Sequence, residues 1–366
     1  MAYPFGHIAT GPSVKRLLHI GAWGRNYGDR AIQWAVREAT GADWGITSSD
    51  CQSTQWTTRE QAEWANAKLD AVLVGGGGLL WDKPELNSVS GWQWQVTPAF
   101  LEALRIPVVV WGIGWTAFPT LKDLTGTHPM FAPTLCWLTE HAAAFTVRNP
   151  ETCDHLGALG IATDRVQVVA DPALGAPWEP WRGGSDVLAL CWASDKADWR
   201  WAGGRYGEAL ALYHVAWAAS ALGLRVRIVP HIEKLDERAR TLLGSWGVLH
   251  DKLDDTRPDL YPPTCECVRE WASAAYGDVR VVVSMRKHGM LIPASMGAPV
   301  VGLGQLAEVG YLARQIGVPM LHEGDEQDTV TRLIREAQPV DTDNVTWARQ
   351  CNALLAETLA GLTGGT

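Results

Sequence analysis

Short apolar runs alternate along the chain with segments whose apolar residues recur at helical spacing. Four runs in the first part predict buried strands, at 16–23, 69–80, 106–115 and 166–174. The helical spacing is clear between the first two runs, where Ile32, Ala35 and Val36 recur and Gly41 supplies a stop. The segment 142–160 reads as a strand, a tight Asn-Pro junction and a helix. This alternation is typical of parallel α/β units.

The pattern restarts after a stretch at 175–186 that is rich in Gly and Pro and lacks periodicity, which we interpret as a linker. Strands follow at 187–194 and 224–232, and 279–304 reads as strand, turn, helix and strand. We therefore expect an α/β protein with two doubly wound, Rossmann-like domains facing a cleft. The expected limits are 1–178 for the N-terminal domain, 186–345 for the C-terminal domain, and 346–366 for a last helix that packs back on the N-terminal domain. Ligands of such sheets bind beyond the carboxyl ends of the strands.

The length and the net charge of the chain limit its domain count and its possible partners. A chain of 366 residues is too long for one ordinary core. With 31 basic and 40 acidic residues the net charge is −9, which gives no support for a nucleic-acid partner and leaves room for a local basic pocket. The first ten residues lack the pattern of a signal peptide, and no apolar run approaches the roughly 18 to 20 residues that cross a bilayer. We expect a cytoplasmic protein without a membrane span.

The cysteines and tryptophans favour ordinary core positions. The seven cysteines form no CxxC pair, and the "CEC" at 265–267 is weak as a zinc site without a second pair, so reduced and mostly buried thiols are expected. Trp92 and Trp94 in "SGWQWQ" either stack on sugar rings or bases or fill apolar space, and apolar filling is the preferred interpretation. No metal or cofactor is expected.

Small and polar residues follow several of the predicted strands. The residues expected to line the cleft are Asn26, Gly28, Asp29, Gly76, Gly77, Trp81 and Asp171. The run "VGGGGLL" either lets backbone approach a ligand or lets a helix pack closely on a strand, because glycine has no side chain. It lacks the full GxGxxG spacing, so a dinucleotide fingerprint is not indicated. The loop "RNYGDRA" either lines the cleft or is an ordinary turn whose acid complements a helix dipole.

The stretch "VVVSMRKHGM" carries the sharpest chemical signal. Arg286, Lys287 and His288 directly follow a strand of valines, and a short helix begins near Gly289. Free backbone N–H groups and two cations therefore converge where a phosphate or carboxylate can bind. The alternative is that the two cations pair with surface acids and the histidine only completes a turn. We expect these four residues to bind an anionic donor.

The segment "VVVSMRKHGMLIPASMGAPVVGLG" also resembles the S-x-R-x-H-G signature of the polysaccharide pyruvyltransferase family. Further landmarks of that family occur in the same order, at 26–29, 72–80, 108–115, 146–160 and 168–174, so that the resemblance covers about residues 16 to 320. It implies a GT-B-like fold and transfer of a pyruvyl group from phosphoenolpyruvate to sugar hydroxyls as a ketal, with the acceptor on the side of domain 1–178 and the donor on the side of domain 186–345.

The resemblance also assigns roles. It implies that Arg148, Arg286 and His288 contact the donor, with His288 as the acid that protonates its methylene carbon and with no metal required. Two positions of one motif depart from the family. Where many relatives carry Tyr-x-x-Lys, this chain has Gln305 and Glu308. An anion there opposes binding of a trianion unless Lys287 compensates, so the identity of the donor stays open.

Two other functions remain open on the sequence. The first is a GT-B glycosyltransferase, in which Arg286, Lys287 and the helix start hold the diphosphate of a nucleotide sugar and the acceptor is a saccharide or a modified nucleic acid. The second is a non-catalytic module that binds an anionic ligand. The released product separates them: inorganic phosphate, a nucleoside diphosphate, or neither.

Overall fold

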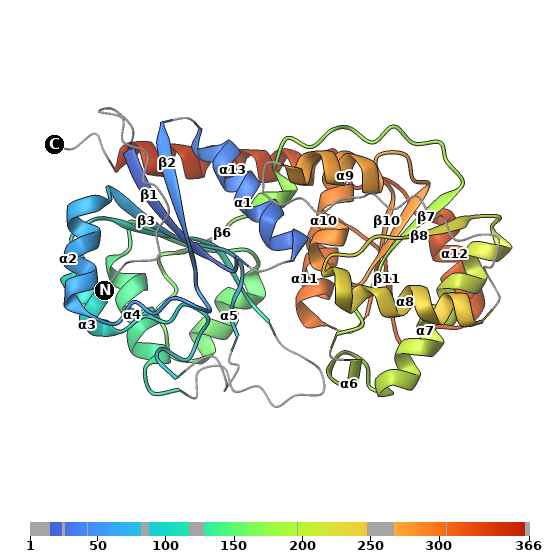
Figure 1. The fold of residues 1–366 in the computed structure, drawn as a ribbon, viewed down its shortest axis with the longest axis horizontal. Coiled ribbons are helices and arrows are strands. Elements are labelled where there is room, and N and C mark those ends of the chain that lie inside the picture. Colours follow the sequence, from blue (N-terminus) through green and yellow to red (C-terminus); the bar gives the residue numbers. More distant parts are fainter. Residues whose placement is uncertain are drawn as a thin grey trace.

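The protein contains two parallel β-sheets side by side, each covered by helices on both faces, so the expected α/β fold class is confirmed (Figure 1). The computed structural model describes residues 15–23, 26–41, 43–81, 88–116, 128–195, 197–246, 267–304 and 306–362, without the side chains of 233–237. We call residues 15–174 the N-terminal half and residues 187–336 the C-terminal half.

The N-terminal half alternates strands and helices. Its strands are β1 (Lys15–Gly21), β2 (Trp44–Asp50), β3 (Ala71–Leu80), β4 (Val108–Trp115), β5 (Ala144–Val147) and β6 (Val166–Val168). Its helices are α1 (Tyr27–Thr40), α2 (Arg59–Lys68), α3 (Pro98–Ala103), α4 (Phe131–His141), α5 (Pro150–Ala158) and the 3₁₀ turn η1 (Pro172–Leu174).

The C-terminal half repeats the alternation. Its strands are β7 (Val187–Cys191), β8 (Arg225–Ile228), β9 (Val281–Ser284), β10 (Val300–Leu303) and β11 (Met320–Leu321). Its helices are α6 (Ala197–Arg200), α7 (Gly204–Ala221), α8 (Glu233–Ser245), α9 (Val268–Tyr276), α10 (Lys287–Met296), α11 (Ala307–Ile316) and α12 (Gln327–Glu336), and the chain ends with α13 (Thr342–Gly361).

The two sheets share one topology. The strand order is β2-β1-β3-β4-β5-β6 in the first sheet and β8-β7-β9-β10-β11 in the second, and all paired strands are parallel. In each sheet the order reverses beside the first strand, between β1 and β3 and between β7 and β9. Ligands of open α/β sheets bind at the carboxyl ends of strands beside such a switch point. The fold therefore directs attention to the segments that follow β1, β3, β7 and β9.

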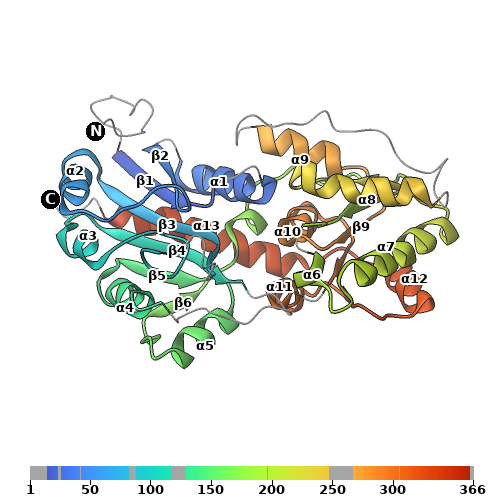
Figure 2. The same ribbon diagram turned by 60° about the horizontal axis from the view of Figure 1, so that its bottom comes forward.

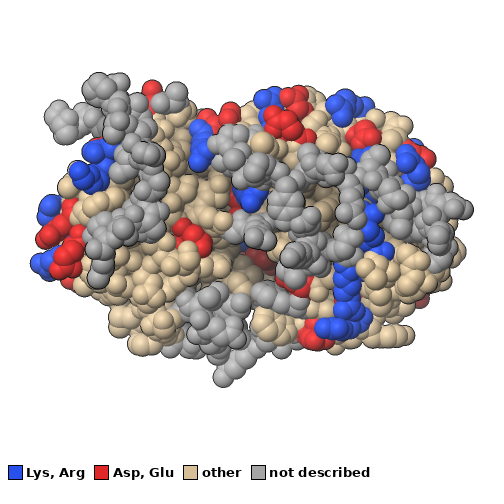
Figure 3. Space-filling model, in the orientation of Figure 1, with Lys and Arg blue, Asp and Glu red and all other residues tan. Residues whose placement is uncertain are grey.

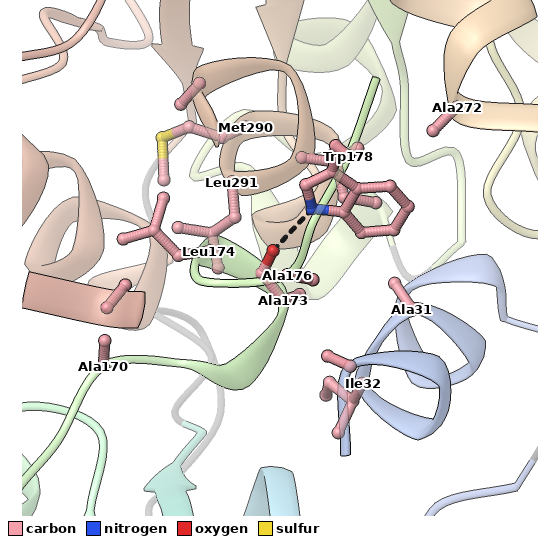
Figure 4. Packing of buried hydrophobic residues seen from close by; sticks show 14 of the residues in the cluster. Ala31, Ile32, Ala170, Ala173, Leu174, Ala176, Trp178, Ala272, Met290 and Leu291 are labelled. Carbon is pink, nitrogen blue, oxygen red and sulfur yellow. Dashed lines mark hydrogen bonds between the residues drawn. The ribbon is translucent and has the colours of Figure 1, made fainter. Parts of the chain in front are cut away.

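An apolar cluster joins the halves. Besides a core within each half, a central cluster combines residues of α1, α9, α10 and α13. Trp178 lies in this cluster, 4.5 Å from the ring of Trp34 on α1, and its indole Nε1 donates to the carbonyl of Ala173 at 2.7 Å (Figure 4). Tyr27 of α1 stacks on Trp271 of α9 with ring centroids 4.6 Å apart. The stretch 175–186, expected as a linker, is thus irregular chain that is partly built into this central cluster.

Helix α13 lies along α1 and η1 of the N-terminal half (Figures 1 and 2). Asn352 donates from Nδ2 to the carbonyl of Pro172 at 3.0 Å. A Cβ on Gly175 would lie 2.4 Å from the carbonyl oxygen of Ala348, so only glycine lets the helix approach this closely. The helix begins at Thr342, four residues earlier than its amphipathic pattern suggested.

Several sequence-based expectations concern the core. Trp92 and Trp94 are fully buried, which confirms their role as apolar filling, and the six described cysteines are free. Cys265 of the "CEC" stretch lies outside the described residues. Within the described part of the chain, no helix is long and apolar enough to cross a membrane. On the face drawn in Figure 3, basic and acidic side chains are interspersed over both halves, and other residues form most of the surface.

Candidate functional site

The candidate site lies at the start of α10, where a tight turn connects this helix to β9. Strand β9 ends at Ser284, and the Ser284 hydroxyl both accepts from the Arg286 N–H at 3.1 Å and donates to the Arg286 carbonyl at 2.7 Å. This tight turn holds Arg286 as the N-cap residue in an extended conformation, and no side chain caps the helix. The first-turn N–H groups and the partial positive charge of the helix start are therefore directed at the region where the two halves meet.

A buried ion cluster spans the halves at this point. Arg148, which follows β5, places Nη2 2.9 Å from Oε2 of Glu308 on the first turn of α11. Lys287 Nζ lies 3.3 Å from the same oxygen, and Thr116 after β4 donates its hydroxyl to it at 2.9 Å. Burial alone would raise the pKa of Glu308, but Lys287 and Arg148 hold the pKa below its ordinary value. One carboxylate thus neutralises part of the charge of two cations.

His288 lies against the N-terminal half. Its Nε2 is 3.4 Å from Oδ2 of Asp171, whose other oxygen accepts from the Ala173 N–H at 3.1 Å. Burial lowers the pKa of His288, while Asp171 raises it, and the net pKa is below the ordinary value. Asp171 has its pKa held below its usual range because His288 and Arg148 outweigh its burial. The carboxylate of Asp171 therefore stabilises the protonated form of His288.

Gly28 on the first turn of α1 touches the imidazole of His288. A Cβ at this position would lie 2.1 Å from Nδ1 and 2.7 Å from Cγ, so any larger residue would displace the ring. Asn26 caps α1 by accepting the Gly28 N–H at 2.9 Å. Burial raises the pKa of Asp29 to about 7, although Lys287 opposes the shift. The "NYGD" stretch therefore places a carboxyl group that titrates near neutrality beside the cluster.

Arg286 contacts a second carboxylate. Its Nη2 lies 2.8 Å from Oδ1 of Asp195, which follows β7, and Arg200 at the end of α6 lies 3.2 Å from Oδ2 of the same residue. Sequence reasoning missed Asp195, Arg200 and Thr116. Thr116 directly follows β4 and Asp195 closely follows β7, which was the available signal for these two residues. Arg200 lies at the end of α6, in the "ASDKADWR" stretch, which contains no recognised motif.

The glycines after β3 divide into two groups. A Cβ on Gly76 would lie 2.1 Å from Ile32, and one on Gly77 would approach the same side chain, so these two glycines accommodate α1. Gly78 instead adjoins the cluster, since a Cβ there would lie 2.3 Å from the Thr116 hydroxyl and 3.3 Å from Nη2 of Arg148. Close approach of backbone to the site therefore fits Gly78 best, whereas the sequence analysis expected Gly76 and Gly77 to line the cleft.

Two other predicted site residues contribute to packing. A Cβ on Gly289 would lie 2.5 Å from the Ser284 hydroxyl and 2.8 Å from Cβ of Cys191, so Gly289 lets α10 pack on its sheet. Trp81 is half-buried against the central apolar cluster. Gln305 lies outside the described residues. The structure thus brings together Arg148, Asp171, Arg286, Lys287 and His288, with Gly28 and Asp29 beside them.

Solved structures of similar GT-B-like fold include UDP-GlcNAc 2-epimerases. The epimerase of Methanocaldococcus jannaschii is 11% identical, with a TM-score of 0.54 over 94% of this chain and 99% of its own. The Neisseria meningitidis epimerase bound to UDP-GlcNAc is 13% identical, with a TM-score of 0.51 over 95% and 100% of the two chains. At these identities the likeness shows the GT-B-like fold alone.

A comparison with curated proteins finds no match. The family model for polysaccharide pyruvyl transferases matches residues 12–305, which is most of the chain. The matched region contains every residue of the cluster described above except Glu308, which follows its end. The resemblance drawn from the "SMRKHG" stretch is thereby confirmed. The chain belongs to the polysaccharide pyruvyl transferase family and is a transferase.

Proposed function

We propose that this protein transfers the pyruvyl group of phosphoenolpyruvate to two hydroxyls of a saccharide, forming a ketal and releasing phosphate. The observation that carries the proposal is the convergence of Arg148, Arg286, Lys287 and His288 at the start of α10. Phosphoenolpyruvate presents a phosphate and a carboxylate on a three-carbon skeleton. Guanidinium groups bind both kinds of anion through paired hydrogen bonds, and lysine adds a point charge.

His288 supplies the acid in this scheme. The protonated imidazole gives its proton to the methylene carbon of the donor, and the positive character that develops at C2 is captured by the oxygen of an acceptor hydroxyl. The carboxylate of Asp171 at 3.4 Å stabilises the imidazolium beforehand. The negative charge of a bound donor acts in the same direction on the pKa of His288, which burial otherwise lowers.

We assign Asp29 as the base that accepts the proton of the acceptor hydroxyl. A carboxyl group with a pKa of about 7 is able both to accept and to return a proton at neutral pH. The first hydroxyl loses its proton to Asp29 as its oxygen bonds to C2. The second hydroxyl then bonds to C2 as the C2–O bond to phosphate breaks, and its proton leaves on the phosphate. Proton return from Asp29 to His288 completes the cycle, and atoms and charge balance.

Thermal stabilisation tests the choice of donor. A ligand present at 100 times its dissociation constant stabilises a protein by about 2.7 kcal/mol, which raises the melting temperature measurably. We expect stabilisation by phosphoenolpyruvate and none by UDP-glucose or UDP-GlcNAc at equal concentration. Stabilisation by the nucleotide sugars alone, with release of UDP on turnover, would replace the proposal with a glycosyltransferase.

A further inference from the structure

Arg286 and Arg200 share one carboxylate in the C-terminal half. Their guanidinium groups lie 2.8 and 3.2 Å from the two oxygens of Asp195, and Arg200 Nε also donates to the Asp195 main-chain carbonyl at 2.9 Å. The side chains of both arginines are 9% exposed. Two cations thus meet one anion in a nearly closed environment.

The same arrangement occurs at the other cluster, where Arg148 and Lys287 share Glu308. Arg286 and Lys287 are neighbours in the chain, yet their side chains contact different carboxylates. Two positions at which a pair of buried cations shares one carboxylate therefore flank the first turn of α10. Buried ion pairs contribute little net stability, because desolvation costs about as much as the attraction returns. Paired buried cations beside a helix start are suited to receiving an anionic group.

We propose that Arg200 and Arg286 form a phosphate subsite, in which Asp195 is an internal counter-ion that competes with the ligand. The position between Arg148, Lys287 and Thr116 then receives the carboxylate of the same ligand. The ligand class is a phosphate monoester of a short carboxylic acid. This assignment rests on the proposed function for the identity of the donor.

Three features place the phosphate on the Arg200 side. Two guanidinium forks provide enough donors for the three oxygens of a phosphate, whereas a planar carboxylate needs only one fork. Arg286 is also the N-cap of α10, so the uncapped first-turn N–H groups adjoin this subsite, and helix starts commonly bind phosphate. Burial lowers the pKa of Arg200 and so does the neighbouring Arg286, whereas Asp195 raises it. A bound dianion beside Arg200 would stabilise its charged form.

Binding of single-group ligands to variants tests the assignment by calorimetry. Inorganic phosphate probes the phosphate subsite, and pyruvate probes the carboxylate position. Arg200→Gln should weaken phosphate and phosphoenolpyruvate by about 10- to 100-fold, the value of one charged hydrogen-bonded contact, and leave pyruvate unchanged. The matched control is Arg227→Gln. Arg227 is similarly buried and pairs with Asp278 at 2.7 Å, near the start of β9 and away from its carboxyl end, so its loss should leave all three affinities unchanged.

Asp195→Asn should change phosphate affinity in the opposite direction. This second variant tests the proposal even if Arg200→Gln does not fold. Removing the competing charge should tighten phosphate binding several-fold, whereas a purely structural ion pair would make both variants bind more weakly. Unchanged or weaker phosphate binding by Asp195→Asn overturns the inference, as does unchanged phosphate binding by folded Arg200→Gln or a loss confined to pyruvate. A wild-type protein that binds phosphate as described but forms no ketal would refute the proposed reaction and leave the subsite standing.

Discussion

Glu308 lies where the donor carboxylate is expected, so removing its charge is the most informative single change. Glu308→Gln keeps the shape and one acceptor oxygen for Arg148 and Thr116, but it deletes the anion that lies 2.9 Å from Arg148 and 3.3 Å from Lys287. Two unit charges about 4 Å apart interact by about 4 kcal/mol at the effective dielectric constant of a protein surface. Glu308→Gln should therefore strengthen binding of the donor, because the donor no longer competes with this carboxylate. Desolvation and displacement of the side chain reduce the gain in binding free energy to about 1–2 kcal/mol, or roughly 5- to 30-fold tighter binding.

The same change should destabilise the folded protein. Removing one partner of a buried ion pair costs about 3–5 kcal/mol, and the retained hydrogen bond and Asp171, 3.5 Å from Arg148, reduce this to about 1–3 kcal/mol. Because the folded-state pKa of Glu308 lies below the ordinary 4.5, its contribution is complete above that pH and is lost as the pH falls through the lower, folded value. The stability difference between wild type and variant should therefore disappear in acid.

Calorimetry with phosphoenolpyruvate and melting curves from pH 8 to pH 3 measure both effects. The control is Glu151→Gln, which removes an exposed pair with Arg314 that also joins the halves at 3.1 Å; such pairs contribute about 0–1 kcal/mol, and donor affinity should not change. If Glu308→Gln weakens the donor as strongly as Arg148→Gln does, Glu308 orients the cations rather than competing with the donor, and the reasoning fails.

Three other changes separate the roles of the remaining groups. His288→Asn should leave donor affinity nearly unchanged and lower turnover by about 10²- to 10⁴-fold; near-normal turnover would remove the acid role. Gly28→Ala should lower turnover because its Cβ would meet Nδ1 of His288 at 2.1 Å, whereas Gly244→Ala, with no heavy atom within 4 Å, is the control; equal rates would show that the ring position is unimportant. Wild-type kcat/KM should follow a bell-shaped pH profile that falls above about pH 7, because turnover needs Asp29 ionised and His288 protonated, and the pKa of His288 lies below its ordinary value; Asp29→Asn should lose the rising limb, and an unaltered profile would exclude Asp29 as the base.

The sequence predicted the fold well because buried parallel strands are continuous apolar runs. It missed β2, whose residues "WGITSSD" are mostly polar because the strand lies at the edge of its sheet and is only partly buried. It also treated 175–186 as a linker, since Gly and Pro indicate irregular backbone but do not reveal that Trp178 is buried between α1 and α10.

The site was predictable to the extent that it follows strand ends. Arg286, Lys287 and His288 are contiguous, so their convergence could be inferred from one stretch of sequence. The partners of these residues could not be inferred. Glu308 pairs with a residue 160 positions away, and that contact depends on how the two sheets face each other. Asp195 and Arg200 likewise occupy a polar segment whose importance appears only when β7 and β9 are seen to be neighbours.

The central claim is that the donor is phosphoenolpyruvate and the product a ketal. The most direct measurement uses phosphoenolpyruvate labelled with ¹³C at C2 and a panel of methyl glycosides that differ in their pairs of free hydroxyls, followed by carbon NMR and phosphate assay. The account predicts that the label appears as a quaternary ketal carbon with one phosphate released for each ketal formed, and that both signals fall together in His288→Asn. Absence of label in any glycoside, together with UDP release when UDP-glucose or UDP-GlcNAc replaces the labelled donor, would contradict it.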